Sequence, residues 1–154
     1  MKTFTTLLAT ALLGAASFAR ADDHGPRVPP LPAYVQECGA CHVAYPAGLL
    51  GAGSWQRQMA NLPKHYGTDA SLDAATTRQL ADWLQANAGS GKRVQAAPPE
   101  DRITRSAWFQ REHDEVSAAA WKRPSIKSAA NCAACHTKAA DGSYREREIK
   151  IPAQ

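Results

Sequence analysis

The chain has 154 residues, with 18 Lys and Arg against 14 Asp and Glu and a net charge of +4 at neutral pH. Lys2 and Arg20 carry two of those positive charges, and the near-neutral remainder gives no case for a nucleic-acid partner. Alanine supplies much of the 44% hydrophobic fraction and large aliphatic side chains are sparse, so burial of the chain's own apolar area is marginal for this length. We therefore expect an additional apolar body in the core.

Residues 1–21 have the three-part pattern of a secretory signal peptide. Lys2 gives the basic start, an apolar stretch runs from about Leu7 to Phe18, and Ala19-Arg20-Ala21 supplies the small residues of a cleavage site. We predict cleavage after this triplet and export to the periplasm. Segment 22–154 has the length of one compact domain and contains no apolar run of about 18 residues, so the processed protein is not expected to span a membrane.

A proline-rich stretch and a glycine-containing loop precede the first predicted helix. Residues 22–32 read DDHGPRVPPLP, which cannot continue a helix and is expected to be extended or mobile. A loop is expected where three glycines occur within six residues, at Gly48, Gly51 and Gly53. Beyond it, apolar residues at helical spacing predict a short helix that ends at Pro63, with an apolar face of Trp55, Met59 and Leu62.

A longer helix is predicted from Ser71, as its N-cap, to about Asn87, with Gly89 just beyond its end. Four apolar residues at helical spacing form its buried stripe: Leu72, Leu80, Trp83 and Leu84.

Residues 88–100 combine glycine, proline and polar side chains, which is typical of a surface connection. They divide the domain into two halves, about 33–88 and about 101–154. In the second half Ser106 is predicted to cap a helix whose inward face carries Phe109, His113 and Val116. The final stretch, YREREIKIP, predicts an extended or solvated tail without an assigned role. Because no β-rich run occurs, the fold is predicted to be mainly α, with little or no sheet.

All four cysteines fall in two copies of one pattern, Cys38-Gly-Ala-Cys41-His42 and Cys132-Ala-Ala-Cys135-His136. C-x-x-C-H is the attachment signature of c-type haem. Two thiols at this spacing can each reach one vinyl group on the same haem edge, and the adjacent histidine then lies beneath the iron. The sequence therefore predicts two covalent haem c groups attached through the four cysteines, with His42 and His136 as iron ligands.

Three other readings of the cysteines remain open. Two disulfides could cross-link an exported domain of this size, and C-x-x-C alone could be a redox-active dithiol. Neither explains a histidine after both cysteine pairs. Zinc held by cysteine and histidine is the third alternative, although zinc does not require the five-residue motif.

The sixth position of each iron has few candidates. His65 lies 23 residues after His42, just past Pro63, so the chain can fold back over the first haem. His113 lies 19 residues before the second motif, on the predicted inward helix face, and can cap the second haem. Met59 is the alternative, and a methionine ligand would raise the reduction potential, but a methionine among apolar neighbours at helical spacing is usually core.

At this point the chain resembles the small periplasmic bacterial dihaem cytochromes c. The likeness covers nearly all of segment 22–154 and is carried, in order, by ECGACHVAYPAGLL, SWQRQMANLPKHYGTDASL, RITRSAWFQREHDEV and NCAACHTKAADGSY. It implies a helical fold with two bis-histidine haems, in which His65 and His113 match the family's distal ligands. Members of the family pass electrons between a membrane-bound b-type cytochrome and an oxygen-binding, high-spin c-type haem protein, and the resemblance implies such partners here.

These residues predict an electron carrier and not an enzyme. An iron with histidine on both sides can change oxidation state without gaining or losing a ligand, and two histidines predict a low potential. Tryptophan and tyrosine side chains are expected to pack against the porphyrins. The alternative is a haem enzyme or gas sensor in which one distal histidine detaches and opens an iron site.

Two weaker hypotheses remain. The basic residues Lys122, Arg123 and Lys127 are either a docking patch or an ordinary solvated surface. Cleavage after Ala21 would place His24 third in the processed chain, where it can complete a Cu(II) or Ni(II) site with the terminal amine and two amides; a chain end with no such role is the simpler interpretation.

Overall fold

The computed structural model describes residues 28–153, so the predicted signal peptide and His24 lie outside the described residues. The described residues form five α-helices: α1 Pro32–Gly39, α2 Ala52–Ala60, α3 Ala74–Ala86, α4 Ala107–Glu112 and α5 Ala118–Trp121. They also form seven short 3₁₀ turns: η1 Ala47–Leu49, η2 Leu62–Lys64, η3 Pro99–Asp101, η4 Ile103–Arg105, η5 Cys132–Ala134, η6 Ala139–Asp141 and η7 Glu146–Glu148.

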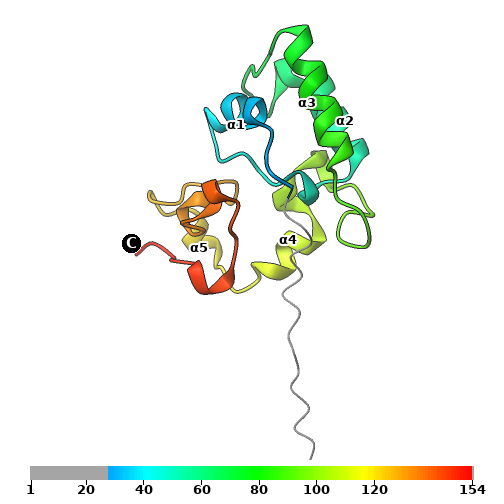
Figure 1. Cartoon of the computed structure of the whole chain (residues 1–154). Helices are drawn as coiled ribbons and strands as arrows, with labels where there is room; N and C mark the ends of the chain where they lie inside the picture. Colours follow the sequence, from blue (N-terminus) through cyan, green and yellow to red (C-terminus); the bar gives the residue numbers. More distant parts are fainter. Residues whose placement is uncertain (1–27, 154) are drawn as a thin grey trace, which may run out of the picture.

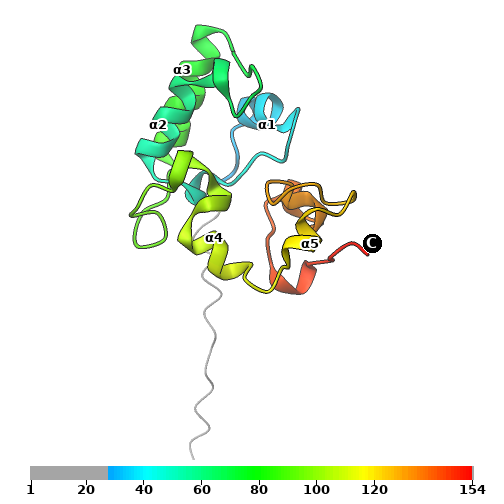
Figure 2. The same cartoon turned by 180° about the vertical axis from the view of Figure 1, so that it is seen from behind.

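The helices are arranged in two lobes joined through α4 (Figures 1 and 2). Helices α1, α2 and α3 lie together in one lobe, and α5 lies in the other with the C-terminal segment. Within residues 28–153, strand-like pairing is limited to two isolated bridges, His65–Thr68 and His136–Ile149. The predicted mainly helical fold is therefore confirmed. No helix in this described stretch is long and apolar enough to cross a membrane.

The buried core of the first lobe lies where α1, α2 and α3 meet. Its fully buried side chains include Leu50, Leu80 and Leu84. The Trp55 indole donates a hydrogen bond of 2.7 Å to the Ala47 carbonyl, which satisfies its one polar group. Met59 is 9% exposed and belongs to the same core cluster, as its helical spacing predicted.

Helix α2 differs slightly from its prediction. It begins at Ala52 and ends at Ala60, so Gly53 lies inside the helix and not in the preceding loop. The chain then forms η2, with Pro63 at its centre, because proline lacks the amide that would continue the α-helix.

Gly89 marks a close approach of backbone to backbone. Its amide donates to the Leu50 carbonyl at 2.8 Å, and a Cβ at this position would lie 2.3 Å from the Gly48 carbonyl oxygen. Only glycine fits without displacing the loop that precedes α2.

The N-cap predicted for α3 was wrong. Asp73 is the cap, and its carboxylate accepts the amides of Ala75 and Thr76 at 2.9 and 3.0 Å. Ser71 is instead held in the preceding turn, where its amide and hydroxyl both donate to the Asp69 carboxylate. A carboxylate at the N-cap also interacts favourably with the positive end of the helix dipole. This interaction explains why Asp73, and not the nearby serine, caps the helix. The predicted end at Asn87 was correct.

Helix α4 is shorter than its periodicity predicted. Ser106 caps it as expected, since its hydroxyl accepts the Phe109 amide at 3.1 Å. The helix ends at Glu112, with His113 at the C-cap, so Val116 lies beyond it. Helix α1 was not predicted, because the proline-rich stretch that leads into it suggested an extended chain. Pro32 occupies a first-turn position, where proline is tolerated.

The C-terminal segment packs against the second cysteine motif. Lys150 donates its amide to the Cys135 carbonyl at 2.9 Å, and Ile149 forms the bridge with His136. Arg123 donates to the Pro152 carbonyl at 2.7 Å. The sequence predicted an extended tail or a solvated short element here, and the segment contains the short turn η7. Its backbone contacts with the second motif could not be read from alternating charges.

Replacing Asp73 with Ala should lower the melting temperature by a few degrees, because the first amides of α3 lose their acceptor. Thermal unfolding followed by circular dichroism measures this. Asp82→Ala is the matched control, since it removes an exposed aspartate from the interior of the same helix. Equal melting temperatures for the two variants would contradict the capping role.

Candidate functional site

The first motif begins inside α1 and leaves it. Cys38 lies in the last turn of the helix, and Cys41 and His42 follow in the turn after it. The His42 ring is held on two sides: its Nδ1 lies 2.8 Å from the Val43 carbonyl oxygen, and the Tyr45 ring stacks on it with centroids 4.5 Å apart and planes 11° apart.

His65 faces His42 from the end of η2. Its amide donates to the Leu62 carbonyl at 3.2 Å, and its own carbonyl accepts the Thr68 amide at 3.0 Å. These two backbone bonds fix the turn that presents the imidazole. The ring centroids of His42 and His65 are 6.3 Å apart, and their planes differ by 25°.

The second motif makes a similar pair from different elements. The His136 amide donates to the Cys132 carbonyl at 2.8 Å, which closes the turn of the motif. His113 ends α4, where its Nδ1 lies 2.9 Å from the Phe109 carbonyl oxygen and its ring stacks on Phe109 at 4.0 Å. The centroids of His113 and His136 are 6.1 Å apart, with planes 73° apart.

Both separations fit one metal ion between two imidazoles. A bond from a metal to an imidazole nitrogen is about 2.0 Å long, and each ring nitrogen lies about 1.1 Å from its centroid. Two imidazoles on opposite sides of one iron therefore have centroids roughly 6 Å apart. The structure brings His65 to His42 and His113 to His136, the same pairs that the sequence predicted, while Met59 is packed in the core.

Hydrogen bonding and burial act on these imidazoles in different ways. A carbonyl oxygen only accepts, so the Nδ1 atoms of His42 and His113 are the donors in these two contacts, and Nε2 is the nitrogen left for a metal in the neutral ring. Burial lowers the pKa of His65 and of His136, and the facing histidine of each pair lowers it further. In the described part of the chain, the buried Nδ1 atoms of His65 and His136 have no hydrogen-bond partner.

The cysteines lack the properties of a redox-active dithiol. Burial raises the pKa of Cys38 and of Cys132 to about 11, so both thiols are protonated at neutral pH. Reactive dithiols need the opposite shift, toward the thiolate. All four cysteines are unpaired, so the structure contains neither of the disulfides that the sequence left open.

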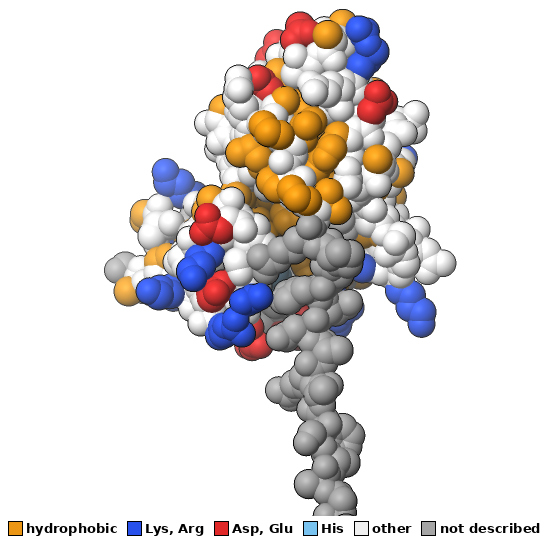
Figure 3. Space-filling view, in the orientation of Figure 1, with side chains coloured by type: hydrophobic (Ala, Val, Ile, Leu, Met, Phe, Trp, Pro, Cys, Tyr) orange, Lys and Arg blue, Asp and Glu red, His pale blue; other side chains and the backbone are white. Residues whose placement is uncertain are grey.

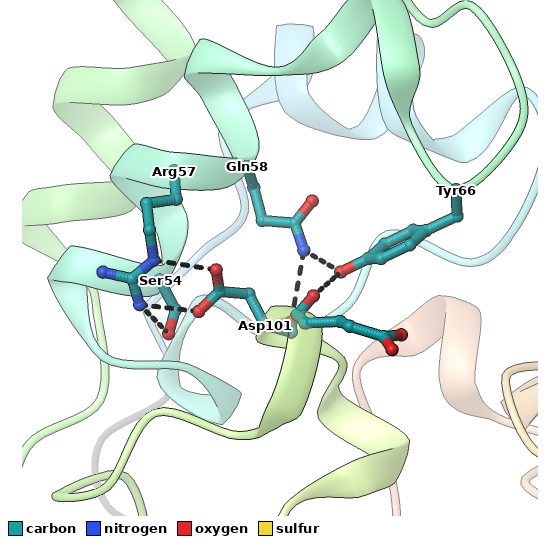
Figure 4. Close-up of polar contacts among 6 residues, drawn as sticks. Ser54, Arg57, Gln58, Tyr66 and Asp101 are labelled. Atoms are coloured by element: carbon teal, nitrogen blue, oxygen red, sulfur yellow. Dashed lines mark hydrogen bonds and ion pairs between the residues drawn. The ribbon is translucent and has the colours of Figure 1, made fainter.

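A polar network anchors the turn that carries His65. Arg57 makes a two-bond ion pair with Asp101, at 2.8 and 2.7 Å, and Gln58 donates to the Asp101 carbonyl at 3.1 Å (Figure 4). Gln58 also bonds to the Tyr66 hydroxyl, which donates to the Glu100 carbonyl at 2.8 Å. Because Tyr66 follows His65 directly, this network connects α2 and the His65 turn to η3.

The same network contains three residues with left-handed backbone. Tyr66, Glu100 and Asp101 have φ values of 51°, 58° and 53°. Such conformations are unfavourable for residues other than glycine and persist where surrounding contacts hold them. Sequence reasoning missed this network, since none of its members forms a recognisable motif. A pocket of about 480 Å³ lies beside it, and His65 is among the residues that line it.

The aromatic residues divide between the protein core and the histidines. Trp55 and Trp83 belong to or pack on the core of the first lobe, and Trp108 stacks with Arg93. Others lie beside a candidate ligand. The ring centroids of Tyr66 and His65 are 4.9 Å apart, and those of Trp121 and His113 are 6.0 Å apart. Two further contacts were not predicted, Tyr45 on His42 and Tyr144 beside His136 at 5.1 Å. Tyr45 lies only three residues after its motif, which could have indicated it.

Hydrophobic side chains gather over α1 on the surface of the first lobe (Figure 3). Val35 is 44% exposed on this helix, and Cys38 of the same helix is half-buried. An apolar group attached to Cys38 would therefore pack against the apolar surface over α1.

Comparison with known proteins gives a consistent result. A family profile described as dihaem cytochrome c matches residues 34–144. The chain is similar to a dihaem cytochrome c of Shewanella baltica, with 35% identity and a TM-score of 0.71 over 82% of this chain and 96% of the other. It is also similar to a dihaem cytochrome c of Rhodobacter sphaeroides, with 45% identity and a TM-score of 0.65 over 76% and 99%. No curated protein matches.

Replacing Asp101 with Asn should lower the melting temperature at neutral pH, because Arg57 loses its charged partner. The hydrogen bonds from Arg57 hold the pKa of Asp101 below its ordinary value of 3.8. The ion pair therefore stabilises the fold above that value, and its contribution disappears as the pH falls through the lowered pKa.

The difference in melting temperature between wild type and Asp101→Asn should be largest above about pH 4 and shrink in stronger acid. Asp82→Asn, at an exposed position on α3, controls for the loss of a carboxylate. A difference that does not change with pH would show that the ion pair is not its source.

Proposed function

Because this chain belongs to the dihaem cytochrome c family and carries two haem c groups, we propose that it is an exported electron carrier whose irons are each held by two histidines. The observation that carries this proposal is the pair of facing imidazoles in each lobe, with centroids 6.3 and 6.1 Å apart. That separation suits an iron with both axial positions filled.

The proposal assigns a role to each motif residue. Cys38 and Cys41 would hold the first haem covalently, and His42 and His65 would bind its iron. The corresponding cysteines of the second motif would hold the second haem, and His136 and His113 would bind its iron. In support, each pair of histidines comes from segments that independent backbone contacts hold in place.

The haem supplies an iron that can hold or release one electron. The protein keeps the coordination constant while this occurs. The Val43 and Phe109 carbonyls orient His42 and His113 and favour the tautomer with a free Nε2. The network around Tyr66 limits movement of the His65 turn. Because no ligand is exchanged, little reorganisation accompanies the change of oxidation state, and two histidine ligands favour a low potential.

We place this carrier in the periplasm, between a membrane-bound b-type cytochrome and a high-spin c-type haem protein. The secretory pattern of residues 1–21 and the haem motifs support this location. The partners rest on the resemblance stated above. We expect no nucleic-acid partner, since the near-neutral charge of segment 22–154 gives no basis for such binding.

The alternative is a haem enzyme or gas sensor in which one distal histidine detaches. His65 lines a pocket of about 480 Å³ and is the candidate for that movement. Against it, both backbone hydrogen bonds of His65 and the contacts of Tyr66 hold the turn in place. The proposal therefore expects the reduced protein not to bind carbon monoxide at either haem.

Replacing His65 or His113 with Ala should convert one of the two haems to a high-spin form and leave the other low-spin, because each substitution removes one axial ligand. The change is measured by low-temperature EPR and optical spectroscopy of the haem-loaded protein, after a pyridine haemochrome count. Each variant should also gain carbon monoxide binding at one haem.

Met59→Leu is the matched control, and it should leave both spectra unchanged because Met59 is packed in the core. A near-infrared band of histidine–methionine ligation in the wild type, lost in Met59→Leu, would contradict the assignment of His65. Carbon monoxide binding to the unaltered reduced protein would instead support the enzyme or sensor.

Mass spectrometry of the exported protein should give an N-terminus at Asp22 and the added mass of two haems. This follows because the signal pattern ends at Ala21 and both motifs bind haem covalently. A processed chain that begins at another residue would also remove the metal site suggested for His24.

A further inference from the structure

Tyr45 contacts residues of both haem motifs. It is the third residue after His42, and its ring stacks on the His42 imidazole at a centroid distance of 4.5 Å. Its hydroxyl donates a hydrogen bond of 2.7 Å to the carbonyl of Ala130, which is 85 residues away in sequence and two residues before Cys132. One side chain thus connects a candidate ligand of the first iron to the loop that carries the second motif.

The backbone of Tyr45 is itself anchored. The Tyr34 hydroxyl donates to the Tyr45 carbonyl at 2.7 Å, and Tyr34 is only 3% exposed. Tyr34 packs on Trp83 of α3 with ring centroids 5.1 Å apart. The core of the first lobe therefore fixes the position of Tyr45. Through its hydroxyl, Tyr45 holds the loop before Cys132 at a defined distance from that core.

The Ala130 side of the contact is also well defined. Asn131 donates its side-chain amide to the Ile126 carbonyl at 3.0 Å, and Ile126 is fully buried. The Ala130 amide donates to the Ser128 hydroxyl at 3.2 Å. The loop before Cys132 therefore has its own support, so the hydrogen bond from Tyr45 joins two ordered segments.

We propose that Tyr45 is the positioning residue that fixes the separation of the two haems and through it the rate of electron exchange between them. This inference rests on the proposed function, because it needs both haems in place. The step is the passage of one electron from a ferrous to a ferric iron, and no bond forms or breaks. Its rate depends on how closely and how constantly the two centres are held, which the Tyr45 contacts control.

Two variants separate the two contacts of Tyr45. Tyr45→Phe keeps the ring on His42 and removes only the hydrogen bond to Ala130. Tyr45→Leu removes the stacking as well. Thr77→Val is the matched control, because it also removes a hydroxyl-to-carbonyl hydrogen bond, of 2.8 Å, but between Thr77 of α3 and its N-cap residue Asp73.

The experiment measures electron redistribution between the haems after flash reduction of part of the oxidised, haem-loaded protein. The two midpoint potentials are determined for every variant, so that a change in driving force is separated from a change in coupling. Tyr45→Phe should slow the exchange severalfold at unchanged driving force. Tyr45→Leu should slow it further, and Thr77→Val should match the wild type.

An electron-exchange rate in Tyr45→Phe equal to that of the wild type would overturn the proposal. If that variant then differed only in a lower melting temperature, Tyr45 would be a residue that stabilises packing. The proposed function is tested separately, by the spectra of the wild-type protein. A wild type without two low-spin haems would contradict the proposed function before any Tyr45 variant is compared.

Discussion

Each lobe of this protein brings two imidazoles together at a centroid separation, 6.3 Å in one pair and 6.1 Å in the other, that would admit one iron. The paired residues come from segments distant in sequence: η2 brings His65 to His42, and the end of α4 brings His113 to His136. Neighbouring side chains and carbonyls orient the rings of both pairs. A core with few large aliphatic residues is consistent with two haems that contribute apolar surface of their own.

A polar contact joins the two lobes close to a candidate ligand: Tyr45 stacks on His42 and donates its hydroxyl to the loop before Cys132. A second polar network, of Arg57, Gln58 and Tyr66, ties the His65 turn to η3 and supports the first histidine pair. The apolar packing of α2 on α3 stabilises the first lobe without setting its distance from the other.

The two histidine pairs differ in geometry. The planes of His42 and His65 are 25° apart, while those of His113 and His136 are 73° apart. Their surroundings differ too, since Tyr45 and Tyr66 flank the first pair and Phe109, Trp121 and Tyr144 flank the second. Two haems in one chain thus have separate environments, the means by which a protein gives each centre its own potential.

The sequence by itself determined the haem motifs, the end of α3 and the helical class of the fold. These are local: spacing fixes which atoms share a haem edge, and periodicity fixes a helix face. The sequence also predicted His65 and His113 as partners of the two motifs, and the folded chain brings each of them to the histidine of its motif. Tertiary structure decided the rest, including the Asp73 cap, the early end of α4, the packing of the C-terminal segment and the contacts of Tyr45. Each depends on which distant carbonyl or carboxylate is within hydrogen-bond reach, and that distance exists only once the chain has folded.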